Sequence, residues 1–100
     1  MTGANSGIGE VAARHLQACG HALTVVCRSR ERAEQSLSWI QAPSQIVIAD
    51  LSDLHAVKTM AHQLCVDGQQ FDVLVLNAGL QYAGVDRPRW SHQGFELTWA

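Results

Sequence analysis

A glycine-rich turn at the start of the chain runs directly into a helix, and this junction narrows the choice of fold. Gly3, Gly7 and Gly9 lie within the segment Thr2-Gly3-Ala4-Asn5-Ser6-Gly7-Ile8-Gly9. Beyond the turn, apolar residues recur three and four positions apart, which predicts a helix from Gly7 to about Cys19. Gly3 permits a tight turn, Gly7 permits close approach of the backbone to a phosphate, and Gly9 permits the helix to pack near the sheet.

The head of such a helix is suited to an anion. Its first amide groups have no partner within the helix, and the positive end of the helix dipole lies beside them. A pyrophosphate bound there would meet both. Glycines alone could simply form a turn before a helix, but the Thr-Gly in front and the Gly-Ile-Gly behind favour phosphate binding.

Short apolar runs of strand length follow the opening helix. They cover residues 22–27, 45–49 and 71–76, and the last is the clearest candidate for a buried strand. Gly20 separates the opening helix from the first of these runs.

Two further helices are expected between these strands. One begins near Arg30 behind a Ser29 cap, buries Ala33, Leu37 and Ile40, and ends at Pro43. The other begins after Ser52 or Asp53, carries the apolar stripe of Leu54, Val57, Ala61, Leu64 and Cys65, and ends at Gly68. Helices that alternate with buried strands predict one α/β domain over residues 1–100, a Rossmann-like, doubly wound parallel sheet with helices on both faces. A final segment, residues 94–100, could begin another helix.

The composition agrees with one packed domain and excludes several functions. Of 100 residues, 47% are hydrophobic and 16% are charged, and the net charge of −2 comes without a run of like charges. Nucleic acid is therefore not an expected partner, and membrane contact is not indicated. No apolar stretch reaches the ~18 residues of a membrane span. The three cysteines lack metal-type spacing, so we expect reduced thiols and a cytoplasmic location.

Two more motifs follow the second and third expected strands. Asp50-Leu51 comes after the strand at 45–49, and Asn77-Ala78-Gly79 comes after the strand at 71–76. With the Thr-Gly-x-x-x-Gly-x-Gly pattern of residues 2–9, in this order, the chain resembles the short-chain dehydrogenase/reductase family over nearly its whole length. Leu76 stands where the commoner family motif has a first asparagine. The loop after Gly79 and the later Gln93-Gly94-Phe95-Glu96 are similar to the retinol dehydrogenase, WW-domain oxidoreductase and protochlorophyllide reductase subgroup.

The resemblance implies an enzyme that transfers hydride between a nicotinamide cofactor and a small-molecule carbonyl or alcohol. It implies that the glycine turn holds the pyrophosphate, that Asp50 and Leu51 contact the adenine, and that residues 77–79 contact the adenosine ribose. The cofactor-binding residues expected from the turn, the motifs and the charge argument that follows are Gly3, Asn5, Ser6, Gly7, Ile8, Gly9, Arg28, Asp50, Leu51, Asn77, Ala78 and Gly79.

Charge favours NADP over NAD as the cofactor. Arg28 follows the first expected strand, 19 residues after Gly9, and no carboxylate lies between Glu10 and Glu31. An arginine at this place accommodates the 2′-phosphate of NADP, whereas an acid would hold the free 2′-hydroxyl of NAD. For the nearby Arg30 and Arg32, solvation of a helix start is the simpler explanation.

A metal site is not expected. Asp50, Asp53 and His55 are close in sequence and could suggest one, but a helix cap beside a solvated histidine explains them better. His62 and Cys65 share a helical face without a second pair of ligands.

The family's catalytic residues are not found. Catalysis in the family uses a Ser and a Tyr-x-x-x-Lys pair, in which the two side chains lie one helical turn apart. Tyr82 is the only tyrosine, but Asp86 stands four residues later, and the only lysine, Lys58, precedes it. We therefore assign no catalytic residue.

The sheet is also expected to be incomplete, because only Met1 precedes Thr2 where family members have an apolar strand. We expect the chain to be a segment of a longer reductase that is marginally stable and inactive alone. Homo-oligomers of the full-length protein are possible. The alternative is a non-catalytic NAD(P)-binding or interaction module.

Overall fold

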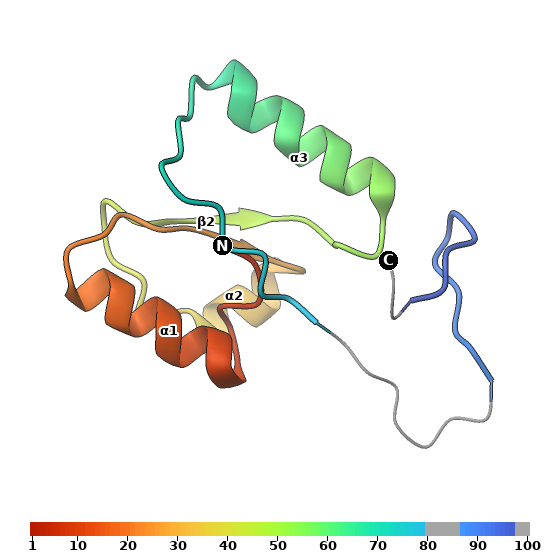
Figure 1. The fold of residues 1–100 in the computed structure, drawn as a ribbon, viewed down its shortest axis with the longest axis horizontal. Helices are drawn as coiled ribbons and strands as arrows, with labels where there is room; N and C mark the ends of the chain where they lie inside the picture. The colour runs from red at the N-terminus through yellow and green to blue at the C-terminus, as the bar shows by residue number, and fades with distance from the viewer. Residues whose placement is uncertain (80–86, 98–100) are drawn as a thin grey trace.

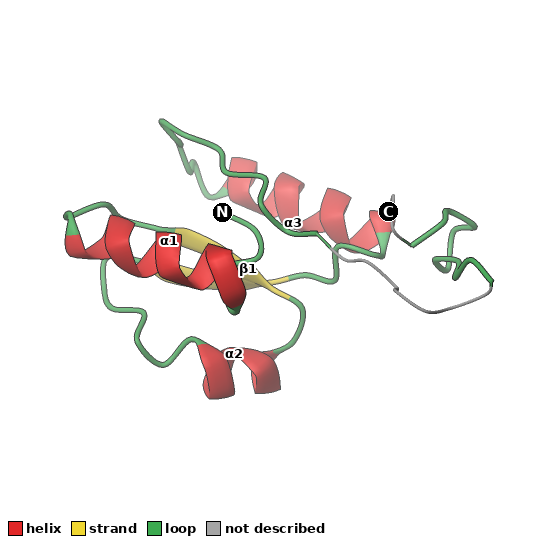
Figure 2. Ribbon diagram, turned by 60° about the horizontal axis from the view of Figure 1, so that its bottom comes forward, coloured by secondary structure: helices red, strands yellow, loops and turns green. Residues whose placement is uncertain are grey.

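The fold alternates helices with parallel strands. The computed structural model describes residues 1–79 and 87–97 (Figure 1). Its elements in chain order are α1 (Gly7–Ala18), β1 (Thr24–Cys27), α2 (Arg30–Ser36), β2 (Gln45–Ile48) and α3 (Leu54–Val66). The strands pair in parallel, with Thr24 opposite Gln45 and Cys27 opposite Ile48. Helices α1 and α2 lie on one face of this sheet and α3 lies on the other (Figures 1 and 2). The predicted α/β class and the two helical layers are confirmed.

The core of the molecule lies between β1, α1 and α2. The buried residues that form it are Ala4, Ala13, Leu23, Val25, Cys27, Ala33 and Leu37. Ala4 belongs to the glycine turn and is fully buried, so packing fixes the turn beside β1. The main chain of Leu23 is satisfied as well, because its N–H donates to Ser44 Oγ at 2.9 Å in the buried interior.

Helix α1 follows its prediction closely. Ser6 precedes it in an extended conformation, and the helix ends at Ala18, one residue before the predicted position. Gly20, at a φ of 92°, then reverses the chain toward β1, and His21 N–H closes the turn by donating to Leu16 O.

Helix α2 is shorter than predicted. Ser29 caps it as expected, with its Oγ accepting from Arg32 N–H at 3.2 Å. The helix ends at Ser36, because Leu37 leaves the helical conformation at a φ of −120° and places its side chain in the core. The prediction that the helix continues to Pro43 was wrong. Burial of Leu37 outweighs helix propensity here, and turns lead from it to β2.

Two residues occupy the central position of the sheet. The Met1 ammonium donates to Thr24 O at 2.7 Å, and Val26 N–H donates to Met1 O at 3.0 Å. On the other side, Thr2 N–H donates to Val75 O at 3.1 Å. Met1 and Thr2 therefore lie between β1 and the segment 71–76, and the incomplete sheet that we predicted is present.

The segment 71–76 is not a strand, and the prediction of a buried strand there was wrong. Val73, Leu74 and Leu76 are 71% to 78% exposed. A ladder needs repeated main-chain pairs. In the described part of the chain, one main-chain hydrogen bond reaches this segment, from Thr2 N–H to Val75 O, so the apolar pattern is present without the ladder that would bury it.

Helix α3 is also lightly packed. It ends at Val66, two residues before the predicted Gly68, and none of its residues is buried. Asp53 rather than Ser52 caps it, with Oδ1 accepting from His55 N–H at 2.9 Å. In the described residues, no helix has the length and apolarity needed to cross a membrane.

The residues near the end of the described chain form a turn. We expected a helix to open at Gly94, but residues 94–97 are not helical, and an antiparallel bridge joins Trp90 to Glu96. Ser91 explains the difference, because its main chain and its hydroxyl both bond to the main chain of Phe95 and favour the turn. Residues 98–100 of this expected helix lie outside the described part.

Candidate functional site

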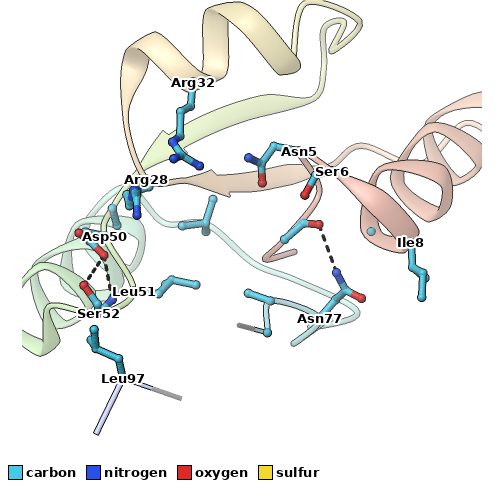
Figure 3. A pocket seen from close by; sticks show the side chains of 16 residues that line it. Asn5, Ser6, Ile8, Arg28, Arg32, Asp50, Leu51, Ser52, Asn77 and Leu97 are labelled. Atoms are coloured by element: carbon cyan, nitrogen blue, oxygen red, sulfur yellow. Dashed lines mark hydrogen bonds between the residues drawn. The ribbon is translucent and has the colours of Figure 1, made fainter. Parts of the chain in front are cut away.

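A pocket of about 640 Å³ opens where the carboxyl ends of β1 and β2 meet the glycine turn and residues 77–79 (Figure 3). Every residue that we predicted to bind the cofactor lines it, except Gly7. The lining residues are Gly3, Asn5, Ser6, Ile8, Gly9, Val26, Arg28, Arg32, Ala49, Asp50, Leu51, Ser52, Asn77, Ala78, Gly79 and Leu97. The carboxyl ends of parallel strands are the usual place for a ligand in a doubly wound sheet.

The glycine turn is packed against residues 77–79 without room for a side chain. A Cβ at Gly3 would lie 2.8 Å from Asn77 Nδ2, and the φ of Gly3 is 70°. A Cβ at Gly9 would overlap Gly3 O and Asn77 Nδ2. Gly9 is therefore needed for close packing, as predicted, although its neighbours are the turn and Asn77 rather than a strand.

Gly7 has a different role from Gly3 and Gly9. Its φ is 55°, and the space around a Cβ at this position is open. The side chain of Ser6, which precedes the helix, makes no capping hydrogen bond. The N–H groups of Gly7, Ile8 and Gly9 precede the first hydrogen bond of the helix, which Glu10 N–H donates to Ser6 O at 3.2 Å. Ser6, Ile8 and Gly9 lie at the pocket. This arrangement fits a pyrophosphate, which accepts hydrogen bonds from such amides.

Thr2 ties the glycine turn to the Asn-Ala-Gly motif. Its Oγ1 accepts from Asn77 N–H at 3.2 Å and from Ala78 N–H at 3.0 Å. Asn77 Nδ2 donates in return to Gly3 O at 3.2 Å, a bond drawn in Figure 3. Our sequence reasoning used Thr2 only as part of the Thr-Gly pattern and missed this role. The signal was its hydroxyl, which a turn can use to satisfy distant amides.

Two arginines reach the pocket. Arg28 follows β1 and Arg32 lies in the first turn of α2, and Figure 3 shows their side chains near one another on one side of the pocket. Arg30 is absent from the lining. Arg32 is exposed, as a solvated helix start requires, and it also lines the pocket, where it can meet a ligand.

Asp50 and Ser52 form a tight turn at the end of β2. Asp50 Oδ1 accepts from Ser52 N–H at 2.9 Å and from Ser52 Oγ at 2.7 Å. This turn places Leu51 at the pocket wall, with Ala49 beside it. An apolar residue next to an anchored carboxylate suits a flat heterocycle that also carries hydrogen-bonding groups. Ser52 was missed as a pocket residue, although an Asx turn after a strand was a readable signal.

Asp53 caps helix α3, which is the role that the sequence favoured over metal binding. Its pKa is lowered from the ordinary 3.8 by a hydrogen bond from the Gln93 side chain, and bonds from the main chain of α3 act in the same direction. Among residues 1–79 and 87–97, no group of three or more His, Cys, Asp or Glu side chains could hold a metal ion.

Lys58 lies exposed on α3. Tyr82 lies outside the described residues. The described chain therefore supplies residues that can bind and orient a ligand, and we assign none of them to proton transfer.

Comparison with known proteins shows the family of the chain. The model of the short chain dehydrogenase family matches residues 1–96. The chain is 34% identical to a chloroplastic protochlorophyllide reductase of Chlamydomonas reinhardtii over 102 residues, which is 98% of this chain and 26% of the relative. It is 35% identical over 85 residues to retinol dehydrogenase 12 of Bos taurus, covering 80% of this chain and 27% of the relative.

A third relative, dehydrogenase/reductase SDR family member 7B of Xenopus laevis, is 36% identical over 93 residues, which is 84% of this chain and 29% of the relative. The chain thus spans between a quarter and a third of the length of these three curated relatives. The match of the family model to nearly all of the sequence shows that the chain belongs to the short-chain dehydrogenase/reductase family of oxidoreductases.

Proposed function

We propose that this chain forms the dinucleotide-binding part of an NADP-dependent oxidoreductase that moves hydride between the nicotinamide and a carbonyl or alcohol. One observation carries the proposal: the glycine turn, the arginines after β1, the Asp50 turn and the Asn77 motif converge on one pocket. When bound, the cofactor supplies the hydride. The described residues bind and orient it.

The glycine turn is the phosphate end of the site. The first amides of α1 would donate to the pyrophosphate, and the hydrogen bonds that Asn77 donates to Thr2 Oγ1 and Gly3 O keep the turn rigid before the ligand arrives. The absence of a Cβ at Gly3 and Gly9 lets these segments pack together. Asn77, Ala78 and Gly79 then lie at the same pocket, where the adenosine ribose would bind.

The arginines favour NADP. Arg28 and Arg32 bring two guanidinium groups to the pocket, and Asp50 is the only acid among the lining residues. Two hydrogen bonds from Ser52 already engage Asp50 Oδ1. The charge of this side of the pocket therefore suits a 2′-phosphate, which a guanidinium can bind through two parallel bonds.

Titration of the full-length protein with NADPH and NADH tests the proposal. Arg28→Ala should weaken NADPH binding about tenfold to a hundredfold, the usual effect of losing a hydrogen bond between charged groups, and should leave NADH binding within about twofold. Arg30→Ala is the matched control, since Arg30 lies two residues away and does not line the pocket. Equal effects of Arg28→Ala on the two cofactors would remove the argument for NADP. Failure of the wild-type protein to bind either cofactor would remove the proposed function.

The alternative, a non-catalytic NAD(P)-binding module, is consistent with these 100 residues, which contain no Tyr-x-x-x-Lys pair. The module and the enzyme would bind the dinucleotide in the same pocket, but only the enzyme would turn over a substrate. Two relatives are named for protochlorophyllide and retinol, so these compounds and simpler aldehydes are the first substrates to test. Oxidation of NADPH by the full-length protein with protochlorophyllide or an aldehyde, or reduction of NADP⁺ with retinol, favours the enzyme, and tight binding without turnover favours the module.

A further inference from the structure

The segment 89–97 is a self-bonded turn that stands outside the sheet. Ser91 N–H donates to Phe95 O, Gly94 N–H donates to Ser91 O at 3.0 Å, and Leu97 N–H donates to Arg89 O at 2.7 Å. Ser91 is buried, and its Oγ accepts from Phe95 N–H at 3.0 Å. These bonds fix the positions of residues 89–97 relative to one another, so a single contact with the rest of the molecule can orient the whole turn.

Gln93 makes that contact at the head of α3. Its Nε2 donates to Asp53 Oδ1 at 2.6 Å, and its Oε1 accepts from Leu54 N–H at 3.4 Å. The same Asp53 oxygen accepts from His55 N–H. The carboxamide of Gln93 thus forms hydrogen bonds both with the cap residue Asp53 and with the Leu54 amide, which has no acceptor within the helix.

The other end of this turn reaches the pocket. Leu97 lines it with Asp50, Leu51 and Ser52, and Figure 3 shows Leu97 beside the Asp50–Ser52 turn. The pocket wall at this place therefore combines Leu51, from the end of β2, with Leu97, from a segment that is 46 positions later in the sequence. Only two residues separate the wall residue Leu51 from Leu54, whose amide meets Gln93.

We propose that Gln93 is a positioning residue for the adenosine end of the dinucleotide site, because its clamp on Asp53 and Leu54 seats Leu97 against the adenine. This inference rests on the proposed function. It goes beyond that function by assigning a specific task to Gln93 and a wall of the adenine site to Leu97.

The clamp needs a group that donates and accepts together. A glutamine does so through its amide, whereas a glutamate at position 93 would place a second carboxylate within hydrogen-bond distance of Asp53. An asparagine at position 53 would restore a donor to face that glutamate, and asparagine is also a good helix cap. The pair can therefore be broken by one substitution and repaired by a second.

The experiment measures binding of NADPH, NADH and 5′-AMP to the full-length protein. Gln93→Glu should weaken the binding of all three ligands about tenfold, since each contains adenosine. The double variant Asp53→Asn/Gln93→Glu should bind them within about threefold of the wild-type affinity. Gln70→Glu is the matched control, because the Gln70 side chain is exposed and makes no hydrogen bond in the described part of the chain. It should bind all three like wild type.

Leu97→Ala provides a second test. It should weaken the binding of 5′-AMP about as much as Gln93→Glu does. The combined variant should bind 5′-AMP no more weakly than either single variant, because both changes remove the same wall. Additive losses, unchanged 5′-AMP binding in Gln93→Glu, or no recovery in the double variant would each overturn the clamp. In those cases wild-type binding of NADPH, with its loss in Arg28→Ala, would leave the proposed function standing.

Discussion

Residues 1–49 and residues 54–79 carry similar apolar patterns and have different fates in the structure. The first region contains β1 and the buried core cluster. The second contains α3, which buries no residue, and the segment 71–76, in which Val73 and Leu74 are more than two-thirds exposed. The difference shows that an apolar pattern indicates which side chains a segment can bury. Whether they are buried depends on another segment that packs against them.

The partner that segment 71–76 needs is a strand at the centre of the sheet. Met1 and Thr2 pair with β1 on one side and with Val75 on the other. Two residues suffice to cover part of β1, which is also paired with β2 along its length. They are too few to form a ladder with all of 71–76. Exposed apolar surface and unpaired main chain consequently lie in the second region.

The largest expected effect tests the core of the first region against the exposed segment of the second. Leu37→Ala should lower the free energy of unfolding by about 2–5 kcal/mol, because the side chain is buried and its loss leaves a cavity. Leu74→Ala makes the same chemical change at a residue that is 71% exposed and should have an effect of less than about 0.5 kcal/mol. Urea unfolding of the 100-residue chain, in which these exposures are found, measures both. Similar losses from the two variants would mean that the second region is packed in solution.

This contrast also explains which predictions from the sequence were correct. The ends of α1 and the cap at Ser29 depend on neighbouring residues, so local patterns located them. Leu37 and the segment 71–76 depend on distant partners. The core draws Leu37 out of its predicted helix, and the short central partner leaves 71–76 unpaired. No local pattern contains that information.

The candidate site follows the same rule. The glycine turn and the two strand-end motifs were recognisable, because parallel strands bring their carboxyl ends together. The contribution of Arg32 depends on the rotation of α2, and that of Leu97 depends on a turn clamped by Gln93. These residues became visible only once the elements were placed in space.

A smaller effect is expected at the junction between the regions, where Gly9 meets Asn77. Gly9→Ala should lower the free energy of unfolding by about 1–3 kcal/mol, because the added Cβ would overlap Gly3 O and Asn77 Nδ2. It should also weaken NADPH binding, since relief of the overlap moves the glycine turn away from residues 77–79. Gly79→Ala is the control for stability, as a Cβ there meets nothing within 4 Å. Paired thermal unfolding and NADPH titration would check both effects, and a Gly9→Ala protein as stable as Gly79→Ala would contradict the packing of this junction.

The smallest effect concerns the cap of α3 and depends on pH. The bond from Gln93, followed by bonds from the start of α3, lowers the pKa of Asp53 below 3.8, and the nearby His55 acts in the same direction. A carboxyl group with a lowered pKa in the folded state stabilises that state above its unfolded pKa, and this contribution is lost as the pH falls through the folded pKa. Asp53→Asn retains a capping oxygen without the titrating charge, so the difference in stability between wild type and variant should shrink as the pH is lowered from 5.5 to 3. Amide hydrogen exchange should show the change in α3 and leave β1 protected, because the cap belongs to the lightly packed region. A pH-independent difference between the two proteins, or equal loss of protection in β1 and α3, would show that the two regions respond as one unit despite their unequal burial.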